Sequence, residues 1–590
     1  MCEYIFRNGE KCSEPSILNS QYCIFHYENS EYHDSLIKLQ NLKIYEKIIN
    51  RDFNFEGAKI YNFSFICLNF VNCNFNDAVF YNDVSFEGAS FEGETNFFKT
   101  IFKFKSSFKY CKYIGISHFH EISFFDNVDF NFATFNDKVK FISTFFNYAE
   151  FSNTIFYNQI FLEDCKFKTI IINNTIFYEF ISFFSSSFEE ECYFNDITFN
   201  KYTNFGKCTF NSSVFFLKTF FKGYTEFRKS RFNKNVHFSD SYWFDKISLS
   251  DSKLSEDSFS EFSMQNVVFL NGIELQRIEF NGETSLINFK SLIDVDFSDC
   301  IFNGELILCN ITVKRSLIFT NVCFCNLLSF FKSGSESKRN ILDISNLMFN
   351  FSKFYKDLKL SNYIFTKSSC ISFIGSEFFS DLIIDNSKFL GDLNLNQISI
   401  KGKFSFHNVE IQKNSEKENF HRAARLYYQE LGQNFDADEH FYQEMKARRV
   451  KTNEILLNNN RVLYENKDSG RFRLNQVKLK TKNFGSIILE QLFLYGTSSR
   501  GVILAFLFIG LIFGGIFFYF ESLNSCILSQ DSSLINNSLI YSYTNILGID
   551  YSSLNQYPLL SIILTIIERI IGLLFFSILT VIIARRYMRT

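Results

Sequence analysis

Four side chains near the amino terminus have the types and the spacing of a metal site. Cys2, Cys12, Cys23 and His26 follow the pattern C-x9-C-x10-C-x2-H. Three thiolates and one imidazole complete the tetrahedral shell of a closed structural Zn²⁺ site, and a segment this short cannot build a core without such a link. We therefore predict a structural, non-catalytic zinc site within residues 1–28. The alternative is that four unrelated side chains fall near one another.

This spacing resembles the WRC zinc motif of plants. The Trp-Arg pair of that motif is replaced by Glu10 and Lys11, so the nuclear DNA-binding role that the resemblance would imply does not carry over. A zinc-dependent nucleic-acid binder would bind through residues 1–50 in a salt-sensitive manner. The neutral composition of that segment argues against it.

The second set of residues that could have a chemical role is a pair of charged side chains in an apolar stretch. Glu568 and Arg569 interrupt residues 559–584, one of two stretches long enough to cross a bilayer; the other is 502–520. Charges inside a membrane are expensive unless they pair or face protein. Because the two residues are adjacent, they cannot share one helical face, and we expect each to find its partner in a second subunit. A dimer and a tetramer both fit this homo-oligomer.

The charges around these two stretches predict their orientation. Basic residues crowd the outer flanks, whereas residues 521–558 contain no Lys or Arg. The positive-inside rule then places both termini and everything before the first span in the cytoplasm. The basic segment 446–482 could bind nucleic acid, but its position before a membrane span favours anionic lipid headgroups.

The two spans and their loop, residues 501–590, resemble the pore unit of two-helix potassium channels, with Gly572 where the inner helix of that family bends. Such a channel needs the filter T-x-G-Y-G. The filter-like residues of this chain are Thr544, Leu547, Gly548, Ile549 and Asp550. The Tyr is replaced by Ile and the second Gly is missing, so a degenerate re-entrant loop or a plain membrane hairpin is the expected form.

A repeat of phenylalanine predicts the element that must position residues 1–28. Most Phe residues from Phe75 to Phe238 lie five and six residues apart in alternation, and the residue two places before each is small or β-branched, as Ala78 and Thr100 are. On a short strand both side chains then point inward. A fixed period of this kind indicates a solenoid in which every turn reuses one inward position.

Stretches such as VSFEGASFEGETNF at 84–97 resemble the pentapeptide-repeat family. The resemblance covers residues 51–411 and implies a right-handed, four-sided parallel β-helix. Two alternating pairs make 22 residues per turn instead of the family's strict five-residue step, and larger corners on two sides would accommodate the difference. At 22 residues per turn, residues 51–411 are expected to form some sixteen turns, stacked at a strand spacing of about 4.8 Å. Inward cysteines such as Cys208 are expected to be buried and reduced.

Helices are expected on both sides of the β-helix. Residues 29–50 predict a capping helix with apolar side chains at helical spacing, namely Leu36, Leu39, Leu42, Tyr45 and Ile49. Residues 412–470 predict an adaptor of two antiparallel helices joined near Gly432. A basic juxtamembrane segment, 471–500, follows.

Composition narrows the function. A net charge of −3 over 590 residues excludes mimicry of DNA by a strongly acidic rod. The chain has no phosphate-binding Gly loop and no nucleophile elbow, and His421 and His440 are expected on solvated helix faces, so we predict no catalysis. The sequence favours a membrane-tethered cytoplasmic scaffold whose β-helix faces bind an unidentified protein. The alternative is an ion channel of the two-helix potassium type with the β-helix as its regulatory domain.

Overall fold

The protein divides into two compact units. The computed structural model describes residues 1–28, 34–254, 260–331, 340–463, 480–481, 487, 490, 499–524, 533–549 and 559–587. The first unit comprises 1–392 with 398–410, and the second comprises 393–397 with 411–590.

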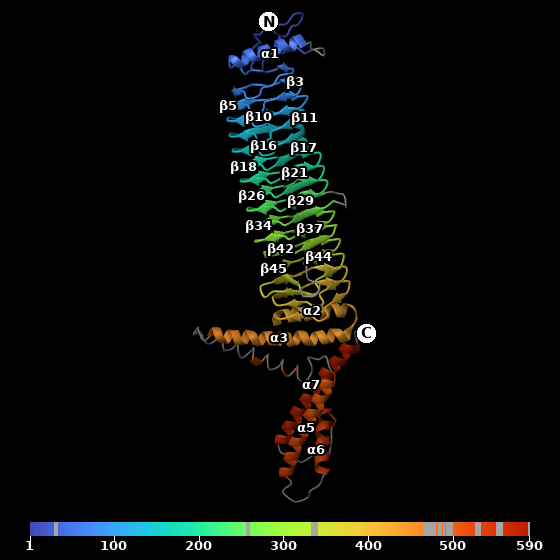
Figure 1. The fold of residues 1–590 in the computed structure, drawn as a ribbon. Coiled ribbons are helices and arrows are strands. Elements are labelled where there is room, and N and C mark those ends of the chain that lie inside the picture. The colour runs from blue at the N-terminus through green and yellow to red at the C-terminus, as the bar shows by residue number, and fades with distance from the viewer. Residues whose placement is uncertain are drawn as a thin grey trace. The chain divides into compact units, whose positions relative to one another are not determined.

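The first unit is a parallel β-solenoid of about 15 turns, close to the sixteen expected. One turn contains β3 (Val79–Phe80), β4 (Val84–Ser85), β5 (Ser90–Glu92) and β6 (Thr95–Asn96). The strands of the next turn pair with them in order, namely β7 (Ile101–Phe102), β8 (Ser106–Ser107), β9 (Lys112–Tyr113) and β10 (Ser117–His120). Repeated pairing of this kind, from β1 (Lys59–Ile60) to β56 (Glu410–Ile411), gives the stack in Figure 1. Each turn contributes to four parallel ladders, which confirms the four-sided β-helix.

Phenylalanine rings fill the solenoid. Phe75, Phe97 and Phe119 lie 22 residues apart, and their rings stack at centroid distances of 4.9 and 5.1 Å with interplanar angles of 6° and 5°. Phe86 and Phe108 form part of a second column at 4.9 Å. All five rings are fully buried. Offset stacking adds to the free energy gained by burying each ring, so the spacing of Phe in the sequence is the spacing of the core.

Two of the four corners in each turn share a backbone conformation. Residues with positive φ recur in them, for example Asp77 at 55°, Lys99 at 57° and Tyr110 at 57°. The amide of Ala78 closes one such corner by donating to the carbonyl oxygen of Phe75 at 3.1 Å. Each of these left-handed residues lies within a five-residue step, as Asp77 does between Phe75 and Phe80, so the corners with positive φ belong to the shorter steps.

The small residues that follow these corners form hydrogen bonds that their size did not predict. The Thr100 hydroxyl donates to the Phe75 carbonyl of the preceding turn at 2.7 Å, and the Cys208 thiol donates to the Phe183 carbonyl at 2.9 Å. Burial raises the pKa of the Cys208 thiol, so this thiol keeps its hydrogen. Thr, Ser and Cys recur at this position because each supplies a hydrogen to a buried carbonyl oxygen that would otherwise lack a second donor.

Helix α1 (Asp34–Ile49) lies across the amino-terminal end of the solenoid (Figure 1). The prediction that the apolar side chains of this helix cover the solenoid was wrong. Leu36 is half-buried, and the others are exposed, namely Leu39, Leu42, Tyr45 and Ile49. The helix instead buries Gln40 and Ile44. The Gln40 amide nitrogen donates to the carbonyls of Ile24 and Lys59 at 3.0 and 2.6 Å, and its oxygen accepts from the Tyr61 amide at 3.1 Å. The end of a solenoid presents unpaired backbone groups, and a polar side chain satisfies them where an apolar one cannot.

The second unit is helical. Helices α2 (Asn414–Glu430) and α3 (Asn434–Leu463) pack against each other, and Gly432 between them has φ of 71°. Helices α5 (Ser499–Asn524), α6 (Ser533–Ile546) and α7 (Leu559–Tyr587) form a second packed group. Among the described residues, only Ile562–Val581 of α7 is long and apolar enough to cross a membrane; the apolar part of α5, Ile503–Tyr519, is shorter.

Candidate metal centre

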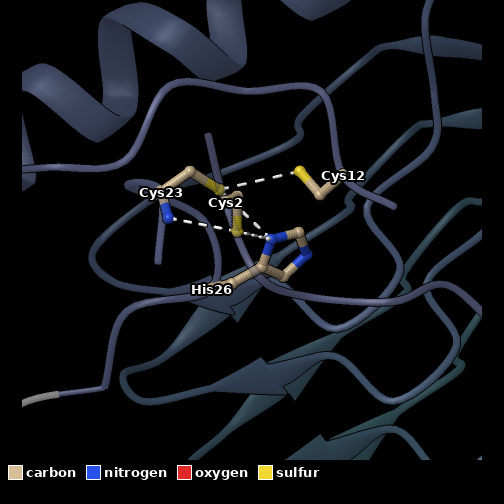
Figure 2. Close-up of side chains that lie close together, drawn as sticks. All are labelled: Cys2, Cys12, Cys23 and His26. Carbon is tan, nitrogen blue, oxygen red and sulfur yellow. Dashed lines mark hydrogen bonds between the residues drawn. The ribbon is translucent and has the colours of Figure 1, made fainter. Parts of the chain in front are cut away.

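The four predicted ligands lie together. The Nδ1 atom of His26 is 3.1 Å from Cys23 Sγ and 3.4 Å from Cys2 Sγ, and the sulfurs of Cys12 and Cys23 are 3.9 Å apart. The four side chains converge on one point (Figure 2). Their ligand atoms all lie within 4.8 Å of one another, and all four residues are buried. Four soft and borderline donors at these separations are able to surround one metal ion.

Backbone contacts orient two of the ligands. The Nε2 atom of His26 is 2.8 Å from the carbonyl oxygen of Glu56, which only a ring nitrogen carrying hydrogen can contact in this way. The Nδ1 lone pair therefore faces the sulfurs, an arrangement that fixes the tautomer of a metal-binding histidine. The Cys23 amide donates to Cys2 Sγ at 3.2 Å, and this contact orients the Cys2 side chain.

The electrostatics of the centre favour a bound cation. Burial raises the pKa of the Cys23 thiol and of the Cys12 thiol. Burial also lowers the pKa of His26 to about 4, so its imidazole is neutral. Without a cation, ionised thiolates in this position would be costly. A metal ion displaces the thiol protons and offsets their charge.

Contacts with the solenoid hold residues 1–28, which carry the four ligands, in place. The Arg7 guanidinium forms two bonds to Asp77, at 2.5 and 2.8 Å, and lies 3.9 Å above the Phe98 ring. The Tyr4 ring stacks on the His26 ring at 3.9 Å. Gly57 makes this approach possible, because its Cβ would lie 2.2 Å from the Tyr4 ring. The centre is thus a cap on the first turns of the β-helix.

Comparisons with family models, with curated proteins and with solved structures find no match for this chain. The assignment of the centre therefore depends on its geometry.

The predicted membrane residues lie at the interface of α6 and α7. Both Glu568 and Arg569 bond to Asn545 of α6: its amide nitrogen donates to Glu568 Oε2 at 2.6 Å, and its oxygen accepts from Arg569 Nε at 3.0 Å. The sequence argument for a second subunit was wrong on this point, because one side chain of the same chain serves both residues. The homo-oligomer stays a prediction.

The filter-like residues are the end of helix α6. The Thr544 hydroxyl donates to the Ile540 carbonyl at 2.8 Å, and the amides of Leu547, Gly548 and Ile549 donate back to residues 543–545. Gly548, with φ of 75°, closes the helix as a left-handed glycine commonly does. Asp550 lies outside the described residues.

Gly572 has a packing role within α7. A Cβ at this position would lie 2.2 Å from the carbonyl oxygen of Ile546, at the end of α6. The glycine therefore lets the two helices approach closely, as small residues do in membrane bundles.

Two further predictions concern helices α2 and α3 and the basic segment 446–482. His421 and His440 are not on solvated faces: both are half-buried, and their Nδ1 atoms are 3.0 Å apart. Residues 464–479 and 482 of the basic segment 446–482 lie outside the described residues, as does most of 471–500, and headgroup binding stays a prediction.

Sequence reasoning missed three residues that support the centre: Arg7, Glu56 and Asp77. Glu56 accepts a hydrogen bond from the Arg7 amide at 2.5 Å through its side chain. These residues belong to no spacing pattern, since their contacts join segments far apart in the chain.

Proposed function

We propose that the protein is a scaffold whose β-helix faces bind another protein, without catalysis. One observation carries this proposal: the solenoid interior is filled by stacked rings, so its outer faces are what it offers to a partner. Aromatic pairs stack outward on one of these faces. Tyr157 and Tyr178 are 48% and 43% exposed, and Phe220 and Tyr242 are 38% and 40% exposed. Exposed aromatic side chains are enriched at protein interfaces.

Cross-linking in intact membranes, followed by mass spectrometry, tests this proposal. The double variant Phe220→Ser with Tyr242→Ser removes one outward pair, and we expect it to lose cross-links that the unaltered protein forms. Tyr355→Ser with Phe379→Ser removes a stacked outward pair from the other sheet and is the matched control. Identical cross-links in all three proteins would contradict binding through this face.

We propose that the metal at the centre is Zn²⁺ and that its role is structural. Four protein ligands leave no position for substrate, and the spacing of the WRC motif supports this identity. Metal analysis of the purified full chain is expected to find one zinc ion per chain, and less than a tenth of that in Cys12→Ser with Cys23→Ser. Cys67→Ser, at an exposed cysteine, should retain it. A different metal in stoichiometric amount would overturn the zinc assignment alone.

We further propose that α5 and α7 anchor the protein as two membrane spans, with both termini in the cytoplasm. We also propose that the β-helix is right-handed and of the pentapeptide-repeat type, which the repeated stretches such as 84–97 support. The absence of Lys and Arg between residues 521 and 558 supports this orientation, and segment 446–482 would meet anionic headgroups. Protease accessibility of sealed, right-side-out vesicles tests it: cleavage between the spans with the solenoid protected is the expected result.

An ion channel is the second candidate, on one observation. Helix α6 has 14 residues, too few to cross a bilayer, and it packs on both α5 and α7. A short helix between two spans is the layout of a pore helix. Current recording after reconstitution separates the two functions, because a selective potassium current would favour the channel.

A further inference from the structure

A buried carboxyl group lies where α5, α6 and α7 meet. Glu568 of α7 is fully buried, as are Ser542 and Asn545 of α6. The Ser542 oxygen contacts Glu568 Oε1, and it also lies 2.9 Å from the carbonyl oxygen of Gly510 on α5. The Asn545 amide nitrogen donates to Glu568 Oε2 at 2.6 Å and to the Thr565 carbonyl at 3.1 Å. One carboxyl group thus joins three helices.

The single hydrogen of the Ser542 hydroxyl indicates whether the Glu568 carboxyl group is protonated. Its hydroxyl has one hydrogen but two oxygen neighbours at hydrogen-bond distance. Two oxygens this close without a hydrogen between them repel. If Glu568 is ionised, one of the two contacts lacks a hydrogen. If Glu568 is protonated, its O–H donates to Ser542, whose own hydrogen goes to Gly510, and both contacts are complete.

The other polar neighbours fit the protonated form. Asn545 has two amide hydrogens for its two acceptors, so it supplies none to Ser542. Arg569, the adjacent charged group on α7, directs its Nε to Asn545 Oδ1 at 3.0 Å. The Tyr541 hydroxyl of α6 lies 3.1 Å from the Thr565 hydroxyl, and on α5 the neighbour is a backbone carbonyl. Burying an ionised carboxylate among apolar helices would add a large cost.

We propose that Glu568 is a proton-binding site and that its proton connects α6 to α5 through Ser542. Loss of the proton leaves the Ser542 hydroxyl with one hydrogen for two acceptors, so either the bond to Gly510 or the bond to Glu568 breaks and α6 loosens. This inference is independent of the scaffold function, because it concerns only the second unit.

Infrared spectroscopy of the full chain in lipid bilayers tests the proposal. At pH 7 we expect the carbonyl band of a protonated carboxyl group in the unaltered protein and its loss in Glu568→Gln. In Ser542→Ala the band should shift, because the carboxyl hydrogen loses its acceptor. Coincident spectra of the unaltered protein and Glu568→Gln at pH 7 would overturn the proposal.

A pH series of thermal unfolding gives an independent readout. Glu568→Gln keeps a donor toward Ser542 at every pH, so its unfolding temperature between pH 7 and 10 should fall less than that of the unaltered protein. Should Glu568→Gln fail to fold, the Ser542→Ala band shift decides alone. An equal fall in both proteins would overturn the connection between α5 and α6.

Discussion

Single aromatic rings link successive turns of the solenoid. Phe97 is fully buried and stacks on Phe75 and Phe119. Phe97→Ala removes both stacks and leaves a cavity, so we expect its local stability to fall by about 3–5 kcal/mol. Hydrogen exchange of the neighbouring turns measures this loss. Phe104→Ala changes a ring that is 49% exposed and should stay within about 0.5 kcal/mol of the unaltered protein; equal losses would contradict the role of stacking.

The histidine pair between α2 and α3 gives a pH dependence at the same scale. Burial, and next the nearby His440, lower the pKa of His421 from 6.5 to about 4. Because the folded pKa lies below the unfolded one, the stability that this residue contributes is present above pH 6.5 and is lost as the pH falls through about 4. We expect hydrogen-exchange protection of both helices to decline in that window. His421→Gln should flatten the decline, whereas His407→Gln, at an exposed side chain, should not.

At the scale of one element, helix α1 depends on a buried polar side chain. Gln40→Leu would give the helix the apolar side chain that its position suggests, yet it leaves the carbonyls of Ile24 and Lys59 and the amide of Tyr61 without this partner. Each hydrogen bond lost to a buried backbone group costs about 0.5–1.5 kcal/mol, so we expect faster proteolysis of residues 1–61. Leu42→Gln, at a side chain 62% exposed, is the control and should behave like the unaltered protein.

The two outcomes for α1 and the solenoid explain what the sequence can predict at this scale. The Phe spacing predicted four ladders and stacked rings, because the same environment recurs every turn and leaves a periodic signal. The ligand spacing predicted the buried Cys/His cluster, because four such residues at short spacing are uncommon. The partners of Gln40, like those of His26 at Glu56, occur once and between distant segments. Nothing periodic marks them, so only the folded chain reveals them.

For the molecule as a whole, the solenoid determines how many turns lose structure when one end unfolds. Each turn contacts only its neighbours, and the metal centre contacts the first turns through Glu56 and Asp77. Removing the proposed metal with a chelator should therefore unfold residues 1–28 and raise hydrogen exchange in the first turns, while turns within 139–238 keep their protection. Cys12→Ser should reproduce this pattern without chelator, and Cys67→Ser should not. A loss of protection along the entire solenoid would show that the cap controls the whole stack, contrary to nearest-neighbour coupling.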